Sequence, residues 1–196
     1  MAGYADYRSI YQKILESEKF QKAAFLRAKL RYANAKKIFF DDFYGHPISK
    51  EISQGPEGSN TSGTLGGYGN LFSFIGFEEG RRPIEEIAQA MEEMFSFQKS
   101  ENTSRSITFK VTYPDINKLK KYSPLAWAFG GSWISGIEKG IPNFSQYIYD
   151  EDILKSRSGS GIEAKSSIRG ANFSPVPYLT PIIEKFKKSI NESSIR

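Results

Sequence analysis

Hydrophobic side chains recur at helical spacing through residues 1–45, a stretch without proline. Apolar residues return every three or four positions over 7–15 and again over 26–33. The pattern predicts a long helix over 1–45 with a break near Ser17 or Phe20. Such a helix exceeds the usual length in globular proteins, so we expect part of it to project or to pack on a neighbouring molecule.

A segment rich in glycine and serine follows at 46–69. It predicts a loop with at most one short helical turn, at 48–52. The next segment, NLFSFIGF at 70–77, places Leu71, Ser73, Ile75 and Phe77 in alternation with Phe72, Phe74 and Gly76. This alternation predicts a β-strand with two apolar faces, which lies either in the centre of a sheet or against a partner.

Later segments have patterns of their own. They predict a helix over 83–97, a half-buried antiparallel strand over 106–113, a short helix over 115–122, a helix over 132–139, a third strand over 162–169 and a short amphipathic helix within 176–190. The order favours the α+β class, with a small antiparallel sheet packed with a long N-terminal helix and a short C-terminal helix. We expect a single domain over 1–196, with its α+β core at 70–190 and a polar tail at 191–196.

Composition limits the possible functions. The chain has 196 residues, no cysteine and a net charge of +5. We therefore expect no disulfide and no thiolate metal site, and the sequence predicts a protein made in the cytoplasm without a signal or membrane-spanning segment.

Charge is segregated: the basic cluster comprises Lys19, Lys22, Arg27, Lys29, Arg31, Lys36 and Lys37, and the acidic cluster Glu78, Glu79, Glu85, Glu86, Glu92 and Glu93. Segregated charge suits nucleic-acid steering, contacts between copies of one protein, or simply two solvated helix faces.

No catalytic constellation emerges. The glycines of GGYGNL (66–71) suggest a phosphate loop, but a loop precedes them and a predicted strand follows, which is the wrong context for a nucleotide fingerprint. His46 is the only histidine, and we expect it in a loop or at a helix cap. The acidic clusters at 41–42 and 150–152 lack the spacing of a calcium loop. The sequence predicts no enzyme activity, no metal and no cofactor.

Three segments carry a resemblance to a known family. A loop of the Thr-Gly-x-Leu type is approximated by the run Ser62, Gly63, Thr64, Leu65. A motif of the Pro-Phe-Leu-x-Pro-Ala type, which opens the last helix, is matched by the run at 177–181 (PYLTP). The segment 130–149 is similar to segments of phage virion proteins. The chain thus resembles the neck or tail-completion proteins of long-tailed bacteriophages, the head-to-tail connectors and tail terminators. It departs from them at 159–174, which is polar and extended where the family's last strand usually ends close to the proline motif.

The resemblance implies a structural virion protein of the neck or upper tail, without enzyme activity, in a ring that joins the DNA-filled capsid to the tail. It implies a ring of commonly six copies, contacts with other neck, portal-side or tail-tube proteins, DNA only in passing through a channel, and no membrane. Candidate subunit contacts are Leu71, Phe72, Phe74, Phe77, Trp133, Tyr178 and Leu179. Candidate DNA-facing residues are Lys29, Arg31, Lys155 and Arg157.

An alternative hypothesis stays open on the sequence alone. The basic helix from Lys19 to Lys37 could lie on the phosphates of a nucleic acid, which would make the chain a nucleic-acid-binding module. The loop KSRSGSGIEAK, at 155–165, could add a contact with a DNA backbone that is blind to sequence.

Overall fold

The computed structural model describes residues 7–65, 69–100, 106–125, 128–139 and 175–191. Its helices are α1 (Tyr7–Glu16), α2 (Glu18–Gly45), α3 (Pro47–Ser53), α4 (Leu71–Ile75), α5 (Pro83–Met94), α6 (Ile116–Leu119), the 3-10 helix η1 (Lys120–Tyr122), α7 (Trp133–Lys139) and α8 (Leu179–Asn191). Its strands are β1 (Ser96–Lys99), β2 (Phe109–Thr112), β3 (Pro124–Leu125) and β4 (Ala128–Ser132). The α+β class is therefore confirmed, with a long N-terminal and a shorter C-terminal helix.

The predicted long helix is present and breaks at Ser17. Ser17 has an extended backbone with φ −60° and ψ 123°, and its N–H donates to the carbonyls of Lys13 and Ile14 at 3.1 Å. The carbonyl of Ser17 then accepts from Gln21 N at 3.0 Å, which opens α2. α1 and α2 are thus two helices joined by a single extended residue, Ser17, which is one of the two positions where the sequence predicted a break.

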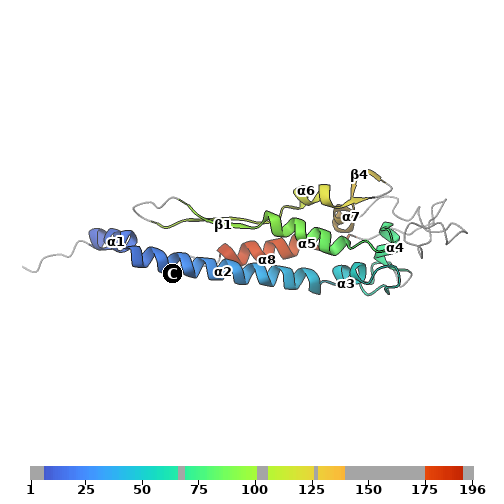
Figure 1. The fold of residues 1–196 in the computed structure, drawn as a ribbon, viewed down its shortest axis with the longest axis horizontal. Coiled ribbons are helices and arrows are strands. Elements are labelled where there is room, and N and C mark those ends of the chain that lie inside the picture. The colour runs from blue at the N-terminus through green and yellow to red at the C-terminus, as the bar shows by residue number, and fades with distance from the viewer. Residues whose placement is uncertain (1–6, 66–68, 101–105, 126–127, 140–174, 192–196) are drawn as a thin grey trace, which may run out of the picture.

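Elongated elements give the molecule its shape (Figure 1). α2 runs along one side, and α8 lies between it and α5, while α1 and the first turns of α2 extend beyond the end of α8. Arg31 on α2 donates through Nε to the carbonyl of Ser189 on α8 at 3.1 Å. The core therefore forms along one face of α2.

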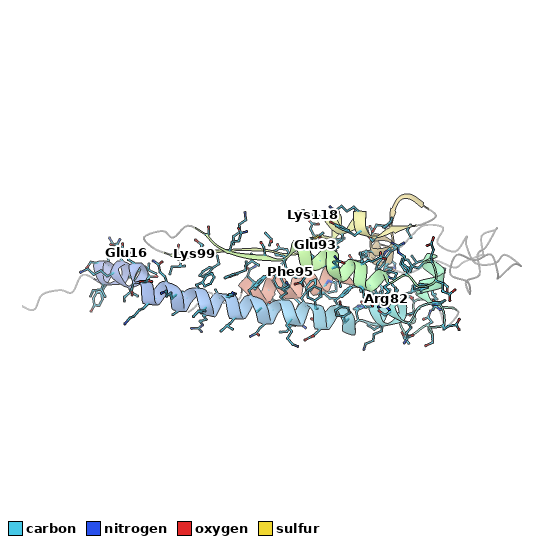
Figure 2. The ribbon with its side chains drawn as sticks, in the orientation of Figure 1. Glu16, Arg82, Glu93, Phe95, Lys99 and Lys118 are labelled. Atoms are coloured by element: carbon cyan, nitrogen blue, oxygen red, sulfur yellow. The ribbon has the colours of Figure 1, made fainter. Side chains whose placement is uncertain are left out.

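Aromatic rings fill this core. Phe95 lies between α5 and the α2–α8 pair (Figure 2), with its ring centroid 5.1 Å from both Phe39 and Phe186. Tyr32 stacks on Phe97 at 5.4 Å, so the core continues under the β1–β2 hairpin. Edge-to-face and offset ring pairs of this kind add stabilisation beyond the burial of apolar area.

Strand β1 was missed by the sequence analysis, which extended the preceding helix to residue 97. The structure ends α5 at Met94, because the following residues pair with β2 in antiparallel register, Ser96 opposite Thr112. Thr112 Oγ1 donates to the carbonyl of Met94 at 3.0 Å and lies 2.7 Å from Ser96 Oγ. The strand predicted at 106–113 is confirmed over its central residues, which form β2.

The predicted strand at 71–77 is wrong, because these residues form helix α4. Asn70 caps this helix: its side-chain oxygen accepts from Ser73 N at 2.9 Å. Gly76 closes it in the left-handed conformation, with φ +81°. Leu71, Phe72 and Ile75 are all buried, so this single turn is apolar nearly all round and imitates the alternation of a strand.

Other predicted elements agree with the structure. The short turn at 48–52 lies in α3, the 115–122 helix is α6 followed by η1, and the 132–139 helix is α7. The C-terminal amphipathic helix is α8. β3 and β4 form a second two-stranded antiparallel sheet that the sequence analysis did not predict. The third predicted strand, at 162–169, lies outside the described residues.

Candidate assembly surface on the N-terminal helices

Helix α2 carries apolar residues on two opposite faces. Its inner face buries Ala35, Phe39 and Phe43 in the core. Because one turn takes about 3.6 residues, Leu26 and Leu30 lie roughly half a turn away from these side chains. We call Ala23, Leu26, Leu30 and Ala33, all exposed, the outer face of α2.

The outer face is open to solvent over its whole length. Leu26 is 58% exposed and Leu30 65%, and Ile38 and Tyr44 extend the apolar surface toward the C-terminal end of α2. Figure 2 shows side chains projecting from the side of α2 that is turned away from α8, with no other element beside them. The fold holds this surface in place because the inner face of the same helix is anchored in the core.

Helix α1 adds a second apolar stripe. Tyr7, Ile10, Tyr11 and Ile14 recur at helical spacing and are between 45% and 77% exposed. Leu15 alone is buried on this helix. Of the ten large hydrophobic side chains that are exposed in the described part of the chain, nine belong to α1 and α2.

Most of the basic cluster on α2 is already engaged. Lys22 pairs with Glu18 at 2.9 Å, Lys37 with Asp41 at 2.6 Å and Lys36 with Glu92. Arg31 donates to α8 as described above. The predicted DNA-facing Lys29 is exposed, whereas the predicted Arg31 is part of the α2–α8 contact. Lys155 and Arg157 lie outside the described residues.

The predicted subunit-contact residues lie in the core. Those buried to 3% exposure or less are Leu71, Phe72, Phe77, Trp133, Tyr178 and Leu179, and Phe74 is half-buried. Large apolar side chains of this kind stabilise the single chain, and a neighbouring molecule does not reach them while the fold is intact. The structure therefore brings these residues together as core rather than as an exposed contact surface.

Tyr178 shows how the proline motif at 177–181 is used in this chain. Its hydroxyl lies 2.7 Å from Ser49 Oγ on α3, and its ring centroid is 4.9 Å from that of His46. Burial raises the pKa of the Tyr178 hydroxyl well above its usual value of 10. The residue therefore stays neutral and fixes the start of α8 against α3.

His46 caps a helix, as the sequence predicted. Its Nδ1 accepts from Ile48 N at 3.3 Å at the start of α3. Burial lowers the pKa of His46 from 6.5, against a hydrogen bond with the backbone of Pro177 that favours the charged form. A groove of about 430 Å³ beside it is lined also by Asp41, Asp42 and Lys185. Lys185 pairs with Asp42 at 2.6 Å, so this groove is a charge-paired surface.

The glycine-rich loop is tied to α3 by a buried carboxyl group. Glu51 is fully buried and accepts from Ser62 N at 2.7 Å and from Leu71 N at 2.8 Å. Leu71 N is the first N–H of α4, the kind of group that a phosphate would use. Because Glu51 already occupies it, the described part of this loop serves as a structural turn.

A second shallow groove, of about 500 Å³, lies between α5 and α6. Its lining includes Glu93 and Lys118, which Figure 2 labels, together with Met94 and Tyr122. Within the described residues, no three His, Asp or Glu side chains gather closely enough to hold a metal ion.

Comparisons of the chain with protein-family models, with curated proteins and with solved structures found no match. The search for membrane-spanning helices, made over the described residues, found none of the required length and hydropathy.

Sequence analysis noted the apolar spacing of the outer face but did not select it as a contact surface. The available signal was a second apolar series on the same helix. Phe25, Tyr32 and Phe39 recur every seven residues, and Leu26, Leu30 and Ala33 form a separate series on the other side. In this chain α2 buries one apolar face in its own core and leaves the other exposed.

Proposed function

We propose that this chain is a structural protein that acts by binding other protein subunits through the outer face of α2 and the apolar stripe of α1. The observation that carries the proposal is the concentration of exposed large hydrophobic side chains on these two helices. Monomeric proteins rarely expose contiguous apolar patches larger than a few hundred Å², and larger ones commonly mark interaction sites. The core does not need these side chains, since it forms on the inner face.

The setting that we propose is the neck or upper tail of a long-tailed bacteriophage. The support is the sequence resemblance at 62–65, 130–149 and 177–181. In that setting, copies of the chain, commonly six, form a ring between the DNA-filled capsid and the tail and contact other neck, portal-side or tail-tube proteins. The chain has no catalytic role there, and DNA meets it only in passing.

Protein binding is favoured over nucleic-acid binding for an electrostatic reason. Affinity for nucleic acid comes mainly from cations on phosphates. On α2, Lys22, Lys36 and Lys37 already pair with carboxylates of the same chain. The outer face also places Leu26 and Leu30 where a phosphate-binding helix needs polar groups.

Light scattering tests the proposal. We would measure the mass of the purified wild-type chain at low and moderate salt, with and without duplex DNA, beside the variant Leu26→Glu/Leu30→Glu. Wild type should associate and the variant should be monomeric with an unchanged circular dichroism spectrum, because both leucines are exposed.

The matched control is Gln89→Glu/Gln98→Glu, which adds the same two negative charges at exposed sites away from the outer face. It should associate as wild type does. A wild-type chain that stays monomeric at every protein concentration would contradict the proposal, and a salt-sensitive complex of a monomer with DNA would favour the nucleic-acid module.

A further inference from the structure

The outer face of α2 has the spacing of a helix-pairing seam. Ala23, Leu26, Leu30 and Ala33 follow one another at intervals of three and four residues. Such spacing keeps one line of side chains directed at a second helix along its length. Lys37 and Tyr44 continue the same line, and Phe40 lies at its edge. The occupant that this spacing fits is another helix.

We propose that this second helix is α2 of another copy of the chain, and that the two helices lie antiparallel about a two-fold axis. This inference rests on the proposed function, because it names the partner of the outer face described there. A two-fold pair closes on itself, so the further contacts of the proposed ring are left to the apolar stripe of α1. In an isologous pair the same patch is used twice, so each favourable contact is repeated. Antiparallel helices also align their dipoles favourably.

One antiparallel register places apolar side chains of one helix against apolar side chains of the other. It places Leu26 level with the partner's Tyr44 and Leu30 level with the partner's Phe40, and the two-fold axis repeats both contacts. Leu26, Leu30 and Tyr44 are between 48% and 65% exposed in the single chain, so they have the most surface to bury. Ala33 then lies level with the partner's Lys37, whose aliphatic stem covers the small side chain.

Charge selects the same register. On one edge of the seam Arg27 comes next to the partner's Asp41, and by symmetry Asp41 next to the partner's Arg27. Arg27 is exposed, and so is Asp41, which pairs with Lys37 of its own chain at 2.6 Å. A parallel pair in register would instead bring Lys37, at the centre of the seam, against the partner's Lys37, and it would place Arg27 and the partner's Asp41 far apart along the helices. Like charges disfavour that arrangement.

Cysteine cross-linking tests the orientation directly, because the chain has no cysteine of its own. We would mix full-length Leu26→Cys with a tagged, heavier Tyr44→Cys chain and oxidise under mild conditions. Positions 26 and 44 are roughly 27 Å apart along one helix, at about 1.5 Å per residue, so orientation decides which thiols meet. An antiparallel pair gives the mixed cross-link, whereas a parallel pair gives only cross-links between like chains.

Glu184→Cys on α8 is the matched control, since it is exposed but far from the seam. Mixed with Leu26→Cys it should give no specific product. Cross-links between like chains, or none in a chain that associates through Leu26 and Leu30, would overturn this inference and leave the proposed function standing. A wild-type chain that stays monomeric would overturn both this inference and the proposed function.

Charge exchange tests the register. Arg27→Glu alone and Asp41→Lys alone should each raise the dimer dissociation constant by about tenfold, because each change converts two attractive contacts into repulsive ones. The double variant Arg27→Glu/Asp41→Lys restores the pairs with reversed polarity and should regain most of the lost affinity. A double variant whose dimer dissociation constant is raised by the two single effects combined would overturn the register.

Discussion

Glu51 is a fully buried acidic side chain that holds two segments together. It belongs to α3, and it accepts hydrogen bonds from the backbone of Ser62 in the glycine-rich loop and of Leu71 at the start of α4. Asn70 adds to this junction, since its Nδ2 donates to the carbonyls of Pro56 at 2.6 Å and Gly58 at 2.9 Å. The small residues of this loop make few apolar contacts. Hydrogen bonds from two polar side chains therefore hold it in place instead.

Replacing Glu51 should loosen the loop. Glu51→Ala leaves the buried N–H of Leu71 and the partly buried N–H of Ser62 without an acceptor, and a buried N–H left in this way costs about 1–3 kcal/mol. The free energy of unfolding in urea should fall by that order, and the amides of Ser62 and Leu71 should exchange hydrogen faster. Lys50→Ala, at an exposed neighbouring position, is the control and should change neither quantity. Slow exchange at both amides in Glu51→Ala would contradict this role.

His46 makes stability depend on pH in a direction set by burial. Its pKa is lowered from 6.5 in the folded chain, so below pH 6.5 the unfolded state binds more protons than the folded state. The stabilisation from the neutral ring is complete above pH 6.5 and is lost as the pH falls toward the lowered pKa. Protonation also removes the acceptor at Nδ1 that caps α3.

The melting temperature should therefore fall between pH 7.5 and pH 5.5, and it should fall less in His46→Asn. Asparagine keeps a capping oxygen but does not titrate, so carboxylates such as Asp41 and Asp42 affect both proteins alike. Equal decreases in wild type and variant would show that His46 does not contribute.

Packing of α2 against α8 is the main contact between elements distant in sequence. Phe186 on α8 is 3% exposed and meets Phe39, Phe95 and Tyr113 with ring centroids between 5.1 and 6.1 Å apart. We expect Phe186→Ala to lower the free energy of unfolding by about 3–5 kcal/mol, as large-to-small changes in cores do. Glu184→Ala, exposed on the same helix, should change it by about 0.5 kcal/mol or less. Similar values for both variants would contradict the packing.

Elements with one strong periodicity could be predicted from sequence, and elements set by distant contacts could not. α5 and α8 each carry one clear helical stripe, α2 carries two apolar series at helical spacing, and Ser17 marks a break that was expected. The end of α5 depends instead on pairing of Ser96 with Thr112. For α4, the cap at Asn70 and the glycine at 76 were visible in the sequence, but the apolar alternation outweighed them.

In the whole molecule, the aromatic core lies on the side of α2 where Figure 1 shows α8 and α5, and the exposed outer face lies on the other side. Sequence analysis expected a projecting helix, and it chose contact residues by hydrophobicity in segments such as 71–77. Hydrophobicity alone does not separate core from contact, because the largest apolar side chains are the ones that a core buries first. The contact surface that we propose is indicated instead by the two apolar series on one helix.

The contact between α2 and α8 also has a consequence for biosynthesis. Arg31 and its acceptor Ser189 are 158 residues apart in sequence. Ribosomes add about 5–20 residues per second, so this acceptor is made roughly 8–30 s after Arg31. Throughout that interval α2 lacks α8, so the part of its inner face that α8 covers is available to chaperones together with the exposed outer face. We expect the yield of native protein to depend on the rate of translation as well as on the final stability.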